Sequence, residues 1–178
     1  KLSILREGWE EPKEFEIVRD VIEVPSLEWK LLENNIAYIR IFQFNEKTAL
    51  DFAKISLKIL ASPAKKIILD LRNNPGGYLE VAEAVGGWFL KRGQVIVIES
   101  WENYKKEEVS NGPETFSEWP IIVLINGGTA SGAEILAAAL KDNRNIVLVG
   151  EKSFGKGSVQ EVKNLKDGSS LKITTAYW

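Results

Sequence analysis

The chemistry open to this chain centres on one serine and one lysine. Ser131 lies in the run NGGTASGAE at positions 126–134, and Lys156 lies in the run FGKG at positions 154–157. The chain contains no histidine and no cysteine, which excludes a Ser-His-Asp triad, a thiolate nucleophile, a zinc site of the usual nitrogen and sulfur type, and a disulfide. Hydroxyl, amine, carboxylate and amide groups remain. If Ser131 is a nucleophile, Lys156 is the best candidate for its base.

Small residues surround Ser131. Gly127, Gly128 and Gly132 would let a substrate backbone approach the hydroxyl closely. The N–H groups of a first helical turn would then face a developing oxyanion. A simpler interpretation is that Ser131 and Glu134 form a Ser-x-x-Glu capping box, in which the hydroxyl only caps a helix. On this segment alone the two interpretations are equally well supported.

The lysine segment has a competing interpretation. Residues 150–157 read GEKSFGKG, which nearly matches the phosphate-binding pattern G-x-x-x-x-G-K-[ST] and makes a nucleotide-hydrolysing enzyme the leading alternative. Gly157 stands where that pattern needs a hydroxyl for Mg²⁺. Residues 159–165 show no helix signal, whereas a phosphate cradle needs a helix N-terminus. Lys156 could also be an ordinary solvated lysine in a loop.

Composition limits both the fold and the partners. The length of 178 residues favours one domain, and 44% apolar residues suffice for a core. A net charge of −2, with lysines and arginines scattered, predicts no binding to nucleic acid or to an anionic membrane. The longest apolar runs, such as residues 121–125, are too short to span a bilayer.

Hydrophobic periodicity indicates an α/β fold in which helices cover a mostly parallel sheet. Strands are expected at 2–5, 15–24, 36–41, 66–70, 95–100, 121–125, 146–149 and 171–177, and helices at 48–60, 79–90 and 129–141. The stretch 104–118 is expected to be a polar excursion outside the core. Ligands in such folds bind where strands end, and residues 73–77, 126–131 and 150–160 follow strand ends. We therefore expect these three segments to form the site.

Taken together, three segments resemble the hallmark motifs of the carboxyl-terminal processing, or tail-specific, proteases of the S41 peptidase family. They read DLRNNPGG at 70–77, NGGTASGAE at 126–134 and GEKSFGKGSVQ at 150–160, and the resemblance covers roughly residues 26–178. It implies a serine endopeptidase that cleaves proteins near their C-termini through an acyl-enzyme, with no cofactor and no metal. It also implies the crotonase/ClpP-like spiral of β-β-α units.

The same resemblance implies roles for a small set of residues. Ser131 would be the nucleophile, Lys156 the general base, and Gln160 the residue that orients the lysine amine. The backbone N–H groups of Gly77 and Gly132 would hold the oxyanion. A free lysine is protonated at neutral pH, so this arrangement needs a site that favours the neutral amine. A non-catalytic binding module on the same fold is a further alternative.

The resemblance also bears on domains, partners and location. Residues 1–25 would be a remnant of the last hairpin of a PDZ domain with a linker, and residues 26–178 a peptidase core truncated at its C-terminus. The partners would be protein or peptide substrates with accessible C-termini, and a homo-oligomer is an open option. The expected location is the bacterial cell envelope, periplasmic or otherwise extracytoplasmic, with a membrane anchor in the full-length protein as a further option.

Overall fold

The main sheet of the protein has five strands. A computed structural model describes residues 1–20 and 25–178. The strands of this sheet are β3 (Leu27–Leu32), β4 (Ile36–Ile41), β5 (Lys66–Asp70), β8 (Ile121–Ile125) and β9 (Val147–Gly150), which is also their spatial order. Strands β4, β5, β8 and β9 run parallel, and β3 pairs with β4 in the antiparallel direction. The expected mostly parallel sheet is confirmed.

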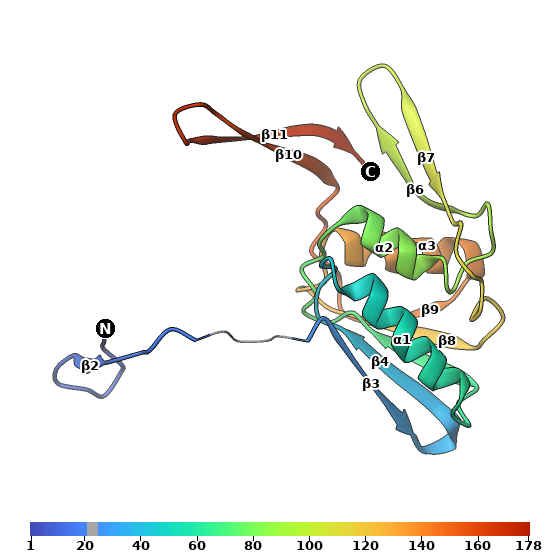
Figure 1. Cartoon of the computed structure of the whole chain (residues 1–178), viewed down its shortest axis with the longest axis horizontal. Helices are drawn as coiled ribbons and strands as arrows, with labels where there is room; N and C mark the ends of the chain where they lie inside the picture. Colours follow the sequence, from blue (N-terminus) through green and yellow to red (C-terminus); the bar gives the residue numbers. More distant parts are fainter. Residues whose placement is uncertain (21–24) are drawn as a thin grey trace.

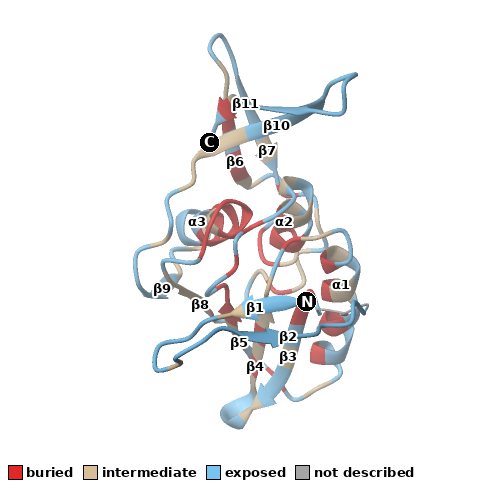
Figure 2. Cartoon of the chain, turned by 90° about the vertical axis from the view of Figure 1, so that its left-hand side faces the viewer, coloured by how far each residue is buried: buried red, intermediate tan, exposed pale blue. Residues whose placement is uncertain are grey.

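Three helices cover one face of this sheet (Figure 1). They are α1 (Thr48–Leu60), α2 (Leu79–Gly86) and α3 (Gly132–Arg144), and a short 3-10 turn, η1 (Glu33–Asn35), joins β3 to β4. In α1, Phe52, Ile55 and Ile59 recur at helical spacing and are buried. They belong to one core with Phe89 and Leu136. Figure 2 shows the buried residues gathered where the helices face the sheet.

A second sheet lies beyond the helices and is antiparallel (Figure 1). Its strands are β6 (Val95–Ser100), β7 (Lys105–Val109), β10 (Ser158–Asn164) and β11 (Ser170–Tyr177), in the spatial order β10-β11-β6-β7. Two hairpins, β6–β7 and β10–β11, supply these strands. The hairpins pair with each other through Tyr177 and Ser100. The helices therefore lie between two sheets.

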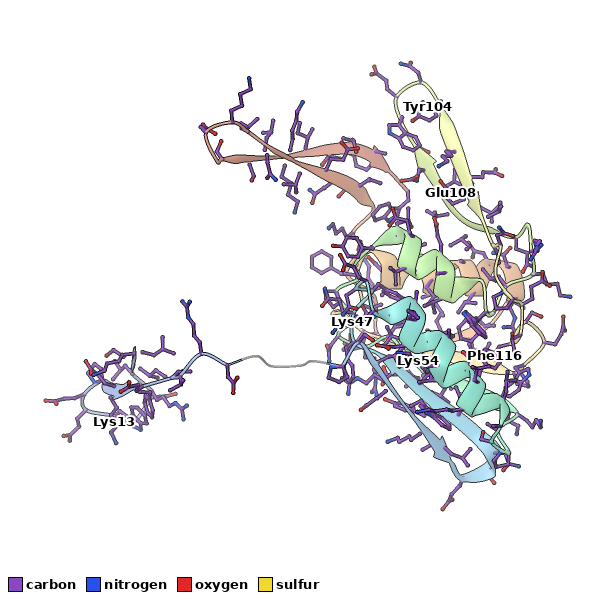
Figure 3. The ribbon with its side chains drawn as sticks, viewed as in Figure 1. Lys13, Lys47, Lys54, Tyr104, Glu108 and Phe116 are labelled. Atoms are coloured by element: carbon purple, nitrogen blue, oxygen red, sulfur yellow. The ribbon has the colours of Figure 1, made fainter. Side chains whose placement is uncertain are left out.

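This second sheet shows that the expected polar excursion at 104–118 is wrong in two respects. Strand β7 lies inside that stretch and pairs with β6. Its charged residues are tolerated because β7 is a largely exposed edge strand. Phe116 is fully buried, with its ring centroid 5.8 Å from that of Phe89 and 5.1 Å from that of Trp119, and it lies within the body of the protein (Figure 3). The polar composition of the stretch hid both features.

Backbone conformation explains why two helices differ from their expected ranges. The helix expected at 79–90 ends at Gly86, because glycine weakens a helix and Gly87 packs so closely on Gly112 that a Cβ there would lie 2.7 Å from the Gly112 Cα. The helix expected at 129–141 begins only at residue 132, since Ser131 has a non-helical backbone. Strand β3 was also not expected, although Leu27, Trp29 and Leu31 alternate with Glu28 and Lys30 as in a half-exposed strand.

The first residues form a separate antiparallel hairpin of β1 (Leu2–Ile4) and β2 (Lys13–Phe15). Figure 1 shows it standing apart from the two sheets. The first strand was expected. The strand expected at 15–24 is wrong for residues 16–20, since β2 shares only Phe15 with that range, and residues 21–24 lie outside the described residues. The assignment of this hairpin to a PDZ domain stays a prediction.

Candidate active site

Three loops meet at the carboxyl ends of β5, β8 and β9. Residues 71–78 follow β5, residues 126–131 follow β8, and residues 151–157 follow β9. Because these strands are parallel neighbours, their carboxyl ends lie along one edge of the main sheet. The fold therefore brings together the three motif segments that the sequence pattern singled out.

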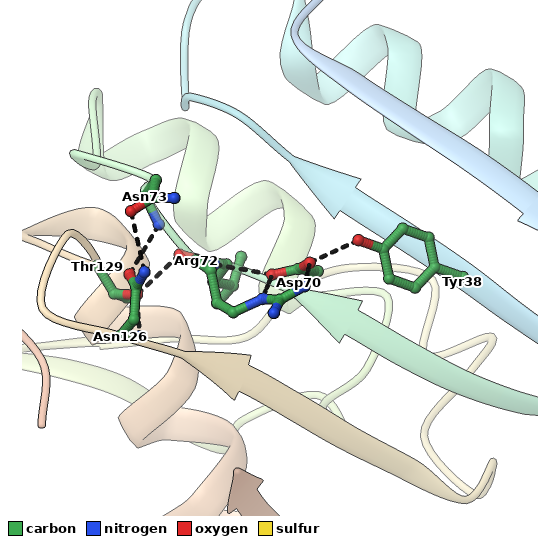
Figure 4. Close-up of polar contacts among 7 residues, drawn as sticks. Tyr38, Asp70, Arg72, Asn73, Asn126 and Thr129 are labelled. Atoms are coloured by element: carbon green, nitrogen blue, oxygen red, sulfur yellow. Dashed lines mark hydrogen bonds and ion pairs between the residues drawn. The ribbon is translucent and has the colours of Figure 1, made fainter. Parts of the chain in front are cut away.

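Reciprocal hydrogen bonds tie the first two loops to each other (Figure 4). The main-chain N–H of Asn73 donates to the Asn126 Oδ1 atom, and the Asn126 Nδ2 atom donates to the Asn73 Oδ1 atom, both at 2.9 Å. The Thr129 hydroxyl donates to the Leu71 carbonyl at 2.8 Å. The loop that leads into Ser131 is thus held at both ends by the loop that follows β5.

Asp70 anchors the end of β5 as a fully buried carboxylate. It accepts hydrogen bonds from the Tyr38 hydroxyl at 2.5 Å and from the Arg72 Nε and Nη2 atoms at 2.9 and 2.7 Å (Figure 4). Burial raises the pKa of Asp70, but the hydrogen bonds from Arg72 and Tyr38 outweigh it and bring the pKa below its ordinary value. Asp70 therefore stays ionised although it is buried, and its hydrogen bonds hold the start of the first loop in place.

Ser131 occupies a strained turn at the start of α3. Its φ of 54° and ψ of −124° lie in a region that residues other than glycine seldom adopt. The Glu134 half of the capping box is present, because its carboxylate accepts the Ser131 N–H. The Ser131 side chain makes no capping hydrogen bond in the described part of the chain, so the interpretation that the hydroxyl only caps the helix stays a prediction. The Glu134 N–H also donates to the Ser131 carbonyl at 2.8 Å. Capping does not exclude chemistry, because hydrolases also present a nucleophilic serine on a strained strand-to-helix turn.

Glu134 has a second role besides its place in the capping box: its carboxylate also binds the main chain of the lysine segment. Its Oε2 atom accepts hydrogen bonds from the main-chain N–H groups of Ser131 and Lys156, both at 2.9 Å, and its Oε1 atom accepts one from Gly155 at 2.7 Å. Burial raises the pKa of Glu134, but hydrogen bonds from Ser153 and from these N–H groups lower it further than burial raises it. No sequence pattern signals this contact, which spans more than twenty residues of chain.

A cleft of about 720 Å³ opens beside Ser131. Gly77, Ser131, Lys156 and Gln160 all line it, so the fold brings together four of the five residues to which the resemblance gave roles. Lys156 is half-buried and Gln160 is exposed. Trp178 also lines the cleft, and its Nε1 atom donates to the Lys156 carbonyl at 3.1 Å. The main chain of Lys156 is therefore held by two side chains, Glu134 at its N–H and Trp178 at its carbonyl.

Gly132, the fifth residue, lies next to Gly77: a Cβ on Gly132 would be 3.8 Å from the Gly77 nitrogen. The other edge of the Gly77 segment pairs with Phe44, which donates to the Gly76 carbonyl and accepts from the Tyr78 N–H, both at 2.9 Å. Because directions alternate along an extended chain, the Gly77 N–H points away from Phe44. Within the described part of the chain, neither the Gly77 nor the Gly132 N–H donates a hydrogen bond.

The parallel sheet, its covering helices and the cleft at the strand ends define a ClpP/crotonase-like fold. The solved structure of a photosystem II D1 C-terminal processing protease shares it, with a TM-score of 0.76 and 28% sequence identity over 88% of this chain and 44% of that one. The chain belongs to peptidase family S41, whose family model matches residues 35–178.

Curated relatives extend this assignment to named proteases. The carboxy-terminal-processing protease of Bartonella bacilliformis is 40% identical over 99% of this chain and 42% of its own length. The carboxy-terminal processing protease CtpA of Bacillus subtilis is 41% identical over 91% of this chain and 35% of its own length. The chain thus spans 35–42% of the length of these relatives.

The alternative interpretation of residues 150–157 as a nucleotide-binding loop is wrong. The phosphate-binding pattern requires a helix after its lysine, whereas the lysine segment here continues into strand β10. The family match agrees with this correction, because it assigns residues 35–178 to a peptidase family.

Proposed function

We propose that the protein containing this chain is a serine endopeptidase of the carboxyl-terminal processing type. The observation that carries the proposal is that Ser131 and Lys156 line one cleft while a single oxygen atom of Glu134 joins their main chains. This arrangement gives a nucleophile and a base without histidine. The identity to carboxy-terminal processing proteases over almost the whole chain supports the same activity.

In the proposed mechanism, the Lys156 amine takes the proton of the Ser131 hydroxyl while Oγ attacks the scissile carbonyl carbon. The N–H groups of Gly77 and Gly132 stabilise the negative oxygen that forms. Lys156 then gives its proton to the leaving amine, and an acyl-enzyme remains. A water molecule deprotonated by Lys156 hydrolyses this ester and restores Ser131. Gln160 keeps the lysine amine directed at the serine.

The finer assignments belong to the same proposal. A peptidase of this family acts on proteins, and the substrates we propose are proteins or peptides with accessible C-termini. We propose a location in the bacterial cell envelope, and the hairpin β1–β2 as the last part of a PDZ domain; a homo-oligomer is an open option. In the described ranges, no helix has the length and apolar character needed to cross a bilayer.

A serine-directed fluorophosphonate tests the proposed chemistry directly. In the protein at its natural length we expect covalent labelling that peptide mapping places on Ser131. Ser131→Ala and Lys156→Ala should abolish labelling, whereas Lys152→Ala, which changes an exposed lysine of the same loop, should retain it. A folded protein that takes no label and cleaves no peptide would be a non-catalytic binding module, and the proposal would then be wrong.

A further inference from the structure

Four glutamates line the cleft without a part in the mechanism above. Glu80 and Glu83 belong to α2, Glu99 to β6 and Glu108 to β7. Figure 3 shows Glu108 on the β6–β7 hairpin, beyond the layer of helices. The acids therefore come from a helix and from the second sheet, and they line the same cleft as Ser131.

Glu99 is a buried acid of the second sheet. The residue is only 8% exposed and lines the cleft. Its cross-strand neighbour is Lys106, but the Lys106 amine forms its ion pair with Glu108. The electrostatic interaction of Lys106 with Glu99 is weaker than that with Glu108. In the part of the chain that the structure describes, the Glu99 carboxylate forms no hydrogen bond and no ion pair. Burying a carboxylate in this way is unfavourable unless a ligand supplies donors or positive charge.

Glu83 shows the same deficit from the helix side. It is half-buried, and its Oε1 atom is shielded from solvent without a hydrogen-bond partner among the described residues. Burial raises the pKa of Glu83 to about 7, the charges of Glu108, Glu80 and Glu99 contribute to the increase, and Lys106 opposes it. Burial is the main cause of this increase, and the neighbouring carboxylates add to it. A positively charged group placed between these acids would favour their ionised forms.

We propose that Glu83 and Glu99 form a subsite for a basic side chain, an arginine or a lysine, of the peptide that lies across Ser131. This inference rests on the proposed function, because it names a feature of the substrate for the same cleft. It goes beyond that function in predicting a residue preference at one position of the bound peptide.

Arginine is the side chain that best fits the subsite. Its guanidinium carries several N–H donors in a fixed fork, so one group can serve two carboxylates that come from different elements. Its aliphatic stem can lie along Leu79 and Val162, which line the same cleft. Lys106 and the exposed Lys172 also line the cleft, and they offset part of its negative charge. The selectivity therefore depends on the two shielded acids.

The test is a binding measurement on the Ser131→Ala protein at its natural length. This variant lacks the nucleophile and therefore cannot cleave the bound peptide. Short alanine-based peptides carry one arginine at each position in turn, and a matched series carries citrulline, which has the same shape without the charge. At one position we expect the arginine peptide to bind about tenfold more tightly than its citrulline counterpart, as a charge-assisted hydrogen bond implies. Adding Glu83→Gln or Glu99→Gln should bring that ratio close to unity.

Glu107→Gln is the matched control, because Glu107 precedes Glu108 on β7 but is exposed and does not line the cleft. This variant should keep the arginine preference. Equal affinity for arginine and citrulline at every position would overturn the inference, and so would a preference that survives the double substitution of Glu83 and Glu99 by glutamine. If the arginine preference is present but the protein with Ser131 unchanged cleaves no peptide, the proposed function is wrong while the basic subsite is supported.

Discussion

The Oε2 atom of Glu134 accepts a hydrogen bond from the main-chain N–H of Lys156 at 2.9 Å. The same atom accepts the N–H of Ser131, so the main chains that carry the proposed nucleophile and base share one acceptor. Because Glu134 belongs to the first turn of α3, a helix positions the lysine segment, although that segment is a loop. Removing this carboxylate should disturb the alignment of the two reacting groups without touching either of them.

Glu134→Ala should lower kcat for peptide cleavage by about tenfold to a hundredfold with little change in KM, because alignment is lost while the substrate contacts remain. Glu134→Gln keeps one acceptor oxygen and should fall between this variant and the unchanged protein. The urea midpoint should also fall, since each N–H left unpaired costs about 1–3 kcal/mol where it is buried. Steady-state kinetics give the separate kcat and KM values. Glu151→Gln, at an exposed acid of the same loop, is the control, and kinetics that match those of Glu134→Ala would contradict the positioning role.

Ser131→Ala and Lys156→Ala should each remove nearly all peptide cleavage, because each deletes one partner of the proton transfer. The double variant should be no worse than either single variant, since groups that act as a unit have effects that do not add. Gln160→Ala should leave a reduced rate. Cleavage rates on a common peptide, with circular dichroism to verify folding, provide the comparison. Normal cleavage by folded Lys156→Ala protein would rule out this mechanism.

Gly76→Ala should damage the site through its backbone. A Cβ at Gly76, whose φ is +92°, would lie 2.6 Å from the Ala130 carbonyl oxygen, 2.7 Å from the Ser131 Cβ and 2.8 Å from the Gly132 nitrogen. We expect a loss of stability of about 1–3 kcal/mol or more from strain and a larger relative loss of activity. Urea unfolding and kinetics measure the two effects. Gly127→Ala is the control and should retain most activity. Among the described residues, the nearest atom to a Cβ there, apart from its chain neighbours, is the Lys152 carbonyl oxygen at 3.9 Å.

Glu83→Gln should stabilise the protein in a pH-dependent way. The folded pKa of Glu83 is raised from 4.5 to about 7, so the folded state holds a proton that the unfolded state releases. The contribution of Glu83 to stability is present below pH 4.5 and is lost as the pH rises to about 7. Glutamine imitates the protonated acid, so the melting temperature of the variant should exceed that of the unchanged protein more at about pH 8 than at about pH 4. An equal difference at both pH values would show that Glu83 ionises normally.

Several local elements could be predicted from the sequence, whereas β3, β7 and the contacts between distant segments could not. The ranges 36–41, 48–60 and 66–70 match β4, α1 and β5 to the residue, because clear apolar periods end at stop signals such as Pro63. The motifs also marked the strand ends that form the cleft. The second role of Glu134 depends on how α3 packs against the lysine segment, and the placing of Glu83 and Glu99 in one cleft depends on how α2 packs against the second sheet. Local sequence periodicity carries no information on such packing.

In the described ranges, the β10–β11 hairpin pairs with β6 through one residue pair, Tyr177 and Ser100, while the two strands of the hairpin pair with each other along their length. Opening the hairpin away from β6 therefore breaks little of the main-chain network. In hydrogen–deuterium exchange the amides of this hairpin should form a weakly protected unit of their own, distinct from those of α3. Gln160 would leave with that unit, whereas Glu134 would keep the Lys156 main chain on the helix. Local opening would then detach the residue that directs the amine while the nucleophile and the base stay assembled.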